Sequence, residues 1–128
     1  MPRRPLILVV DDEHDFRAIV SHVLDRGGYD VVAAGNGEDG LKMFEDYTPD
    51  LVVLDGNLPD MDGIDVCRKL RATEKGKTVP VVMCTVRSAV GTVGDGLSAG
   101  VTDYVVKPFE MEELLERVAK ALEKAAGR

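Results

Sequence analysis

Apolar residues along the chain gather in five short runs, separated by longer segments of mixed polarity. The runs are Leu6–Val10, Val31–Ala34, Leu51–Leu54, Val79–Cys84 and Val101–Val106. The runs are continuous rather than alternating, except that Thr102 and Asp103 interrupt the last one, and most are rich in valine. Such runs are typical of strands that are covered on both faces of a sheet. The pattern therefore predicts five buried strands.

The segments between these runs carry apolar residues at helical spacing. The first helix is predicted from Phe16, Ile19, Val20, Val23 and Leu24, and Gly27-Gly28 ends it. Further helices are predicted over 38–47, 64–71 and 110–125. A fourth helix is expected over 88–98. Three glycines there, each unfavourable by about 1 kcal/mol relative to alanine, predict that it is short or irregular.

The alternation of strands and helices indicates an α/β fold. A doubly wound, five-stranded parallel sheet would be covered by helices on both faces. No linker-like stretch divides the 128 residues, so we predict one domain over 6–124. Residues 1–5 are assigned to an N-terminal tail, and 125–128 to a C-terminal tail or the start of a linker.

Composition narrows the classes of function. The formal charge of −7 argues against nucleic acid as a direct partner, because a phosphate backbone is bound by Lys and Arg. No apolar run approaches the roughly 20 residues that a membrane-spanning helix needs. Cys67 and Cys84 lie in apolar runs and lack the short paired spacing of a metal or redox motif, which indicates reduced, buried thiols in a cytoplasmic protein.

Residues able to carry chemistry stand at the ends of the predicted strands. Asp11 and Asp12 follow the first strand, Asp55 the third, Thr85 the fourth and Lys107 the fifth. In an open parallel sheet, ligands bind beyond the carboxyl ends of the strands. Neighbouring carboxylates repel one another, and Mg²⁺, which prefers oxygen ligands, relieves that repulsion. With a lysine and a hydroxyl to hold phosphoryl oxygens, a carboxylate in such a site can attack phosphorus and form an acyl phosphate.

The same residues resemble the motifs of response-regulator receiver domains, which act in two-component signalling. In chain order the motifs are Asp11-Asp12, the loop Asp55–Gly63, Thr85, Tyr104 and Lys107-Pro108-Phe109. Any one of them is a weak signal, but five in register across nearly the whole chain are specific. The resemblance implies a flavodoxin-like fold with strand order 2-1-3-4-5, in which the first and third strands are neighbours.

The resemblance also implies a role for each residue. Asp55 is the phosphoacceptor, and Lys107 contacts the phosphoryl group. Mg²⁺, or Mn²⁺ in its place, is held by Asp11, Asp12, Asp55 and the backbone carbonyl of Asn57. Thr85 and Tyr104 form the switch that reshapes the face made by the fourth helix, the fifth strand and the fifth helix. The Lys107-Pro108 peptide bond is expected to be cis.

The function that the resemblance implies is that of a phosphoacceptor signalling domain, which assists its own phosphorylation and dephosphorylation and is not a turnover enzyme. The donor would be a histidine kinase or a histidine phosphotransfer protein, and output would go through contacts with another protein or domain. A phosphorylation-linked homodimer would use the switch face. The residues leave open whether the chain is a stand-alone regulator or a receiver cut from a larger multidomain regulator.

Val86 departs from the family pattern. The residue after the family's hydroxyl is usually small, so we hypothesise that Val86 narrows access to the phosphoryl site and slows exchange with small donors or water. Arg87 and Asn57 occupy positions that tune dephosphorylation in the family.

Two other classes of protein place similar residues on a parallel sheet. An aspartyl-phosphate phosphohydrolase usually carries a second Asp two residues after the first, where this chain has Asn57. A flavin carrier needs a phosphate loop rich in Ser, Thr and Gly after its first strand, where this chain has acidic residues. Asp60 and Asp62 are interpreted as turn or cap residues rather than metal ligands.

Overall fold

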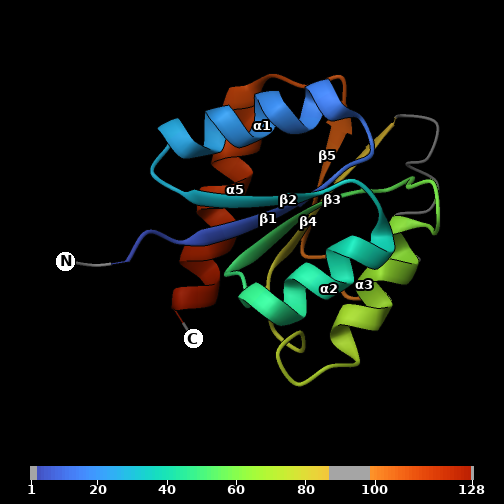
Figure 1. Cartoon of the computed structure of the whole chain (residues 1–128). Coiled ribbons are helices and arrows are strands. Elements are labelled where there is room, and N and C mark those ends of the chain that lie inside the picture. The colour runs from blue at the N-terminus through green and yellow to red at the C-terminus, as the bar shows by residue number, and fades with distance from the viewer. Residues whose placement is uncertain (1–2, 87–98, 128) are drawn as a thin grey trace.

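The computed structural model describes residues 3–86 and 99–127, in which five strands alternate with helices (Figure 1). The strands are β1 (Leu6–Val10), β2 (Asp30–Ala34), β3 (Leu51–Asp55), β4 (Val81–Val86) and β5 (Asp103–Lys107). The helices are α1 (His14–Arg26), α2 (Gly37–Tyr47), α3 (Gly63–Arg71) and α5 (Met111–Ala126). All strand pairs are parallel and their order is β2-β1-β3-β4-β5, which confirms the predicted sheet. The fourth helix expected over 88–98 lies outside the described residues.

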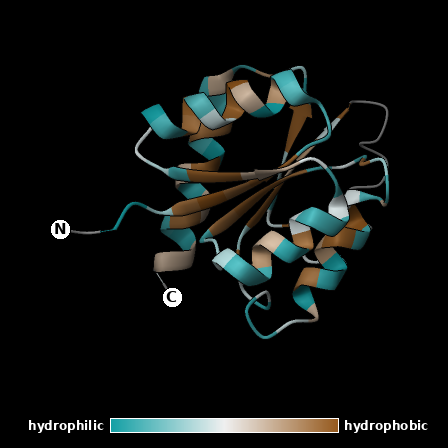
Figure 2. Cartoon of the chain, in the orientation of Figure 1, coloured by the Kyte–Doolittle hydropathy of each residue, from teal (hydrophilic) through white to brown (hydrophobic). Residues whose placement is uncertain are grey.

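The sheet separates the core into two layers, because successive side chains of a strand point to opposite faces. Helices α1 and α5 cover one face, and α2 and α3 cover the other (Figure 1). The strands are hydrophobic along most of their length, whereas each helix mixes hydrophobic and hydrophilic residues (Figure 2). This difference is expected when a sheet is buried on both faces and its helices are buried on one.

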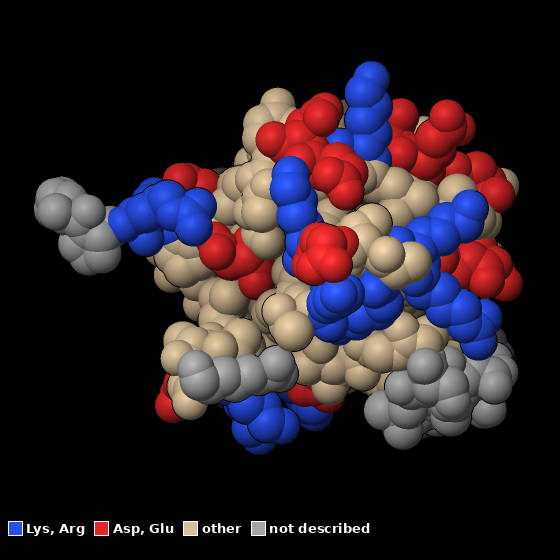
Figure 3. All heavy atoms as spheres, turned by 90° about the horizontal axis from the view of Figure 1, so that it is seen from below, with Lys and Arg blue, Asp and Glu red and all other residues tan. Residues whose placement is uncertain are grey.

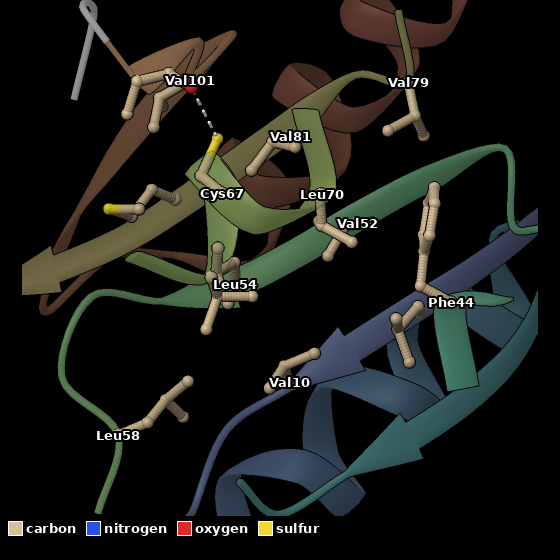
Figure 4. Packing of buried hydrophobic residues seen from close by; sticks show 14 of the residues in the cluster. Val10, Phe44, Val52, Leu54, Leu58, Cys67, Leu70, Val79, Val81 and Val101 are labelled. Carbon is tan, nitrogen blue, oxygen red and sulfur yellow. Dashed lines mark hydrogen bonds between the residues drawn. The ribbon is translucent and has the colours of Figure 1, made fainter. Parts of the chain in front are cut away.

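The layer between the sheet and the α2/α3 pair is built around Phe44 and Leu70, each 1% exposed (Figure 4). Cys67 belongs to this layer, and its thiol donates to the backbone carbonyl oxygen of Ala99 at 3.4 Å. Cys84 lies in the other layer, where burial raises the pKa of its thiol to about 12. Both cysteines are buried and free, as predicted.

Strands β4 and β5 begin and end later than the apolar runs predict. Those runs begin at Val79 and Val101, which lie in the segments that lead into the two strands. Both residues are nevertheless buried, at 7% and 5% exposed, because they fill the α2/α3 layer. An apolar run indicates which residues are buried, but it does not indicate which of them pair with a neighbouring strand. The shift places Thr85 and Lys107 within their strands rather than after them.

Charged side chains of both signs lie on the face of the molecule that Figure 3 shows. On the described part of the face in Figure 3, Lys and Arg side chains lie next to Asp and Glu side chains and to uncharged ones. Arg4, in the segment assigned to the N-terminal tail, donates to the carbonyl oxygens of Asp25 at 2.7 Å and Tyr29 at 2.6 Å. Within the described ranges, no helix combines the length and hydrophobicity needed to cross a membrane.

Asp60, in the loop between β3 and α3, caps the start of α2. Its two carboxylate oxygens accept the backbone N–H groups of Gly37 at 2.8 Å and Glu38 at 2.9 Å, which are among the N–H groups that a helix leaves unpaired. These hydrogen bonds lower the pKa of Asp60 below its ordinary value. Asp62 occupies the N-cap position of α3 but makes no side-chain cap hydrogen bond. Asp60 is thus a cap residue, as interpreted, and the helix that it caps is α2.

We expect Asp60→Ala to lower the midpoint of urea denaturation at neutral pH, because two N–H groups at the start of α2 lose their acceptor. Asp62→Ala removes the same charge from the same loop without breaking a cap hydrogen bond, so its effect should be smaller. The lowered pKa means that the contribution of Asp60 is present above 3.8 and is lost as the pH falls through the folded-state pKa. Equal midpoints for the two variants at neutral pH would contradict this assignment.

Candidate functional site

The candidate site residues are divided between the two faces of the sheet. The alternation of side chains directs Asp11, Asp55 and Lys107 to the face that α1 and α5 cover. Thr85 of β4 is directed to the opposite face, and Tyr104 of β5 packs against the core layer on that side. Asp11, Asp55, Thr85 and Lys107 lie at the carboxyl ends of their strands, where a parallel sheet places its ligands, whereas Tyr104 is the second residue of β5.

Three carboxylates converge at this edge of the sheet. One oxygen atom each of Asp11, Asp12 and Asp55 lies within 4.8 Å of the other two. They meet because β1 and β3 are hydrogen-bonded neighbours. Asp11 is 2% exposed, whereas Asp12 is open to solvent. The structure therefore brings together the three acidic residues that the sequence singled out.

Lys107 lies between two of these carboxylates. Its Nζ atom is 3.2 Å from a carboxylate oxygen of Asp11 and 3.6 Å from one of Asp55, and its side chain is 25% exposed. Burial alone would lower the pKa of Lys107, but the negative charges of Asp55 and Asp11 outweigh burial and raise the pKa. Lys107 therefore remains positively charged at neutral pH.

Asp55 ends β3 in a site that disfavours its charge. Burial is the largest influence and raises the pKa of its carboxyl. Lys107 opposes this effect, Asp11 adds to it, and the pKa remains raised. The N–H of Asn57 donates to the Asp55 carboxylate at 3.3 Å. A Cβ atom at Gly63 would clash with the backbone carbonyl of Asp55, so this glycine lets α3 begin directly against the end of β3.

An open hollow of about 280 Å³ borders Asp55. Its lining residues are Asp55, Gly56, Asn57, Asp62, Ile64, Thr85 and Val86. Thr85 is only 6% exposed, whereas Val86, directly after it, is 50% exposed. The hollow is thus bordered by the predicted phosphoacceptor, by the predicted hydroxyl and by the valine that departs from the family pattern.

Two residues of α1 belong to the site although sequence reasoning gave them no role there. Arg17 donates from Nη1 to the backbone carbonyl oxygen of Asp11 at 2.8 Å. The ring centroid of Phe16 lies 4.4 Å from Nζ of Lys107. An arginine and a phenylalanine are ordinary residues of an amphipathic helix, and only the fold places the first turn of α1 beside the strand ends. No motif in the sequence could have assigned them to the site.

The donor atoms fit a hard divalent cation. Three carboxylates in mutual reach repel one another, and the single positive charge of Lys107 does not balance them. Mg²⁺ prefers oxygen ligands and retains waters that an incoming phosphate can displace. The carboxylate cluster and the hollow beside it therefore suit a cation together with a small anionic group.

The family of the chain follows from its match to a family model. The model for the response regulator receiver domain matches residues 7–119, a range that includes every site residue described above. The chain belongs to the response regulator receiver family.

Curated relatives of this receiver include the alkaline phosphatase synthesis transcriptional regulatory protein PhoP of Bacillus subtilis. It is 41% identical over a region that covers 93% of this chain and 49% of PhoP. The response regulator MprA of a Mycobacterium species is also 41% identical, over 98% of this chain and 53% of MprA. The receiver therefore spans about half the length of the curated relatives that it matches.

Solved structures of response regulators resemble this receiver closely. A putative response regulator from Chloroflexus aurantiacus gives a TM-score of 0.89 at 34% identity, and the match covers 94% of this chain and 99% of that one. The chemotaxis response regulator CheY4 of Vibrio cholerae gives 0.88 at 30% identity, over 93% and 99%. The likeness confirms the flavodoxin-like fold. The Lys107-Pro108 peptide bond is cis in this receiver, in the isomer that the resemblance implied.

Membership of the family makes this receiver a signalling domain of two-component systems rather than a classical enzyme. The phosphohydrolase and the flavin carrier, which the residues alone had left as rivals, are therefore excluded.

Without divalent cations, we expect Asp55→Asn to raise the thermal unfolding midpoint of the receiver at neutral pH. The raised pKa of Asp55 means that the folded state holds this proton more tightly than the unfolded chain does. Ionisation of Asp55 above the ordinary value of 3.8 therefore lowers stability, and Asn removes that cost.

Scanning calorimetry measures the midpoint, and Asp62→Asn is the matched control because it changes the net charge by the same amount in the loop that follows. The rise should be confined to Asp55→Asn. A fall in its midpoint, or an equal rise in both variants, would show that ionisation of Asp55 does not lower the stability of the folded receiver.

Proposed function

We propose that Asp55 accepts a phosphoryl group from the phosphohistidine of a histidine kinase or a histidine phosphotransfer protein, in a reaction that requires Mg²⁺. The observation that carries this proposal is the convergence of Asp11, Asp12 and Asp55 within 4.8 Å of one another, with the ammonium of Lys107 3.6 Å from Asp55. A carboxylate nucleophile, cation ligands and a fixed positive charge are the groups that phosphoryl transfer to an aspartate needs.

The transfer exchanges one bond to phosphorus for another. A carboxylate oxygen of Asp55 attacks the phosphorus atom, a P–O bond forms as the P–N bond of the phosphohistidine breaks, and the imidazole leaves with the bonding electron pair. Lys107 donates to one phosphoryl oxygen and offsets the charge that develops there. Mg²⁺, held by Asp11, Asp12, Asp55 and the backbone carbonyl of Asn57, would supply further positive charge beside the phosphoryl oxygens.

The domain also assists the loss of the phosphoryl group in this account. Water attacks the phosphorus of the acyl phosphate, inorganic phosphate leaves, and the carboxylate of Asp55 is restored. The hollow of about 280 Å³ beside Asp55 gives water and small donors access to that atom. The receiver is thus a self-resetting switch in the cytoplasm.

Docking of the donor protein is assigned to the surface beside Lys107. A second hollow, of about 370 Å³, is lined there by Phe16, Val86, Lys107, Pro108 and Phe109. Ile19, on the next turn of α1, is 52% exposed. An apolar surface next to the reactive carboxylate suits a partner helix that presents its phosphohistidine to Asp55.

Output is assigned to Thr85 and Tyr104. Both lie on the α2/α3 side of the sheet, and Thr85 borders the hollow into which a phosphoryl group on Asp55 would project. Movement of Thr85 toward that group, followed by Tyr104, would reshape the face of β5 and α5. The adjoining part of the proposed output face, in 87–98, lies outside the described residues. This face would bind an output protein or domain, or a second receiver in a phosphorylation-linked homodimer.

A second candidate is a receiver that forms part of a longer transcriptional regulator. Relatives such as PhoP are named transcriptional regulators, and this receiver spans about half their length. In that case the same switch would act on an attached output domain.

Intact mass after incubation with acetyl phosphate and Mg²⁺ tests the proposal. We expect one phosphoryl adduct on the wild type, lost on chelation of Mg²⁺ and absent in Asp55→Asn. Asp46→Asn should be phosphorylated like the wild type, because Asp46 is exposed on α2, outside the carboxylate cluster and the hollow beside Asp55. An adduct that survives in Asp55→Asn would place the acceptor elsewhere. No adduct from either acetyl phosphate or a phosphorylated histidine phosphotransfer protein would refute phosphoryl transfer.

We expect Val86→Ala to raise the rates of phosphorylation by acetyl phosphate and of dephosphorylation by water, each a few-fold, because Val86 lines the hollow beside Asp55. Ile19→Ala is the matched control, since it shortens an aliphatic side chain of similar exposure, 52% against 50%, away from that hollow. Time courses of intact mass give both rates. If Val86→Ala left them unchanged, steric restriction by Val86 would be refuted.

A further inference from the structure

The ammonium of Lys107 has two different kinds of partner. On one side it contacts the carboxylates of Asp11 and Asp55, at 3.2 Å and 3.6 Å. On another side it lies over the ring of Phe16, with Nζ 4.4 Å from the ring centroid. This distance is well within the range in which a cation is attracted to the electron-rich face of an aromatic ring.

The ring of Phe16 is itself held in place. It makes an edge-to-face contact with Phe109, with the centroids 6.0 Å apart and the ring planes at 86°. Both residues pack against the core layer between the sheet and the α1/α5 pair, and Phe16 is half-buried. Phe109 lies two residues after Lys107. The lysine and the residue that orients its aromatic partner therefore come from the same short segment, and α1 supplies the ring between them.

The two kinds of partner respond differently to the proposed reaction cycle. The carboxylates that hold Lys107 are the groups assigned to bind the cation and to accept the phosphoryl group. Their electrostatic attraction for the ammonium of Lys107 therefore weakens when the cation or the phosphoryl group is bound. The face of Phe16 is uncharged and binds neither Mg²⁺ nor phosphate. Its attraction for the ammonium therefore persists when Asp11 and Asp55 are engaged elsewhere.

We propose that Phe16 is a positioning residue, which holds the ammonium of Lys107 at the phosphoryl site when the carboxylates are occupied. The proposal rests on the function assigned to Lys107 above and adds a residue outside the receiver motifs. A phenylalanine that only filled space would be replaceable by any apolar side chain of similar size. A phenylalanine that positions Lys107 must keep its aromatic face.

The test compares Phe16→Leu, which keeps the apolar volume and removes the ring, with Phe16→Tyr, which keeps the ring. The tyrosine hydroxyl has room, because Phe16 borders an open hollow of about 370 Å³. The first readout is the NMR chemical shift of the Lys107 Cε protons, which a ring face moves upfield. We expect the upfield shift in the wild type and in Phe16→Tyr, with and without saturating Mg²⁺, and its loss in Phe16→Leu.

The second readout is the maximal rate of phosphorylation at saturating acetyl phosphate and Mg²⁺. We expect Phe16→Leu to lower it by about 3- to 10-fold, the range that corresponds to a partly exposed cation–π contact, and Phe16→Tyr to restore it. In a Lys107→Ala background, Phe16→Leu should have no further effect, because the two residues act through one contact.

Each contrary result is informative. A Lys107 shift that is the same in the wild type and Phe16→Leu, or that disappears when Mg²⁺ is added, would overturn the proposal. So would an equal loss of rate from Phe16→Leu with and without Lys107, since that outcome indicates a general packing defect. If the wild type itself were not phosphorylated, the proposed function would fail, while the chemical shift would still decide whether Phe16 holds Lys107.

Discussion

The repulsion among three carboxylates at one edge of the sheet is the constraint on which the site depends. The strand order β2-β1-β3-β4-β5 forces Asp11 next to Asp55, and their oxygens, with one from Asp12, lie within 4.8 Å of one another. Burial of Asp55 adds to the cost of its charge. Lys107, which lies in β5 on the far side of β4, offsets part of the unfavourable energy of this charge. A site that is short of positive charge in this way suits the divalent cation that we propose it binds.

The parts around the carboxylates hold them in this unfavourable arrangement. Arg17 fixes the backbone at Asp11, and Gly63 lets the loop after Asp55 fold back against the end of β3. Asp60 joins that loop to the start of α2 through two hydrogen bonds. In the proposed switch, the phosphoacceptor Asp55 lies on the α1/α5 side of the sheet, and the switch residues Thr85 and Tyr104 lie on the α2/α3 side. Phosphorylation would then have to be transmitted around the edge of the sheet, through the hollow that Asp55 and Thr85 share.

Sequence patterns predicted the strands, the order of elements and the placement of Asp11, Asp12, Asp55 and Lys107 along one edge of the sheet, because buried parallel strands are continuous apolar runs and ligands gather at their carboxyl ends. The neighbour relation of β1 and β3 came from a family resemblance, since no local pattern specifies which strands pair. The bounds of β4 and β5 were missed because Val79 and Val101 are buried without being paired. The contact between Phe16 and Lys107 was also missed, because it joins residues from two elements whose separate patterns are ordinary.

The most direct test of the central claim is a crystal structure of the receiver with Mg²⁺ and beryllium trifluoride, a stable mimic of a phosphoryl group on a carboxylate. We expect the trifluoride on Asp55, the cation bound by Asp11, Asp12, Asp55 and the carbonyl of Asn57, and Lys107 and Thr85 in contact with fluorine atoms. A trifluoride on another residue, or a cation bound away from the three carboxylates, would contradict it.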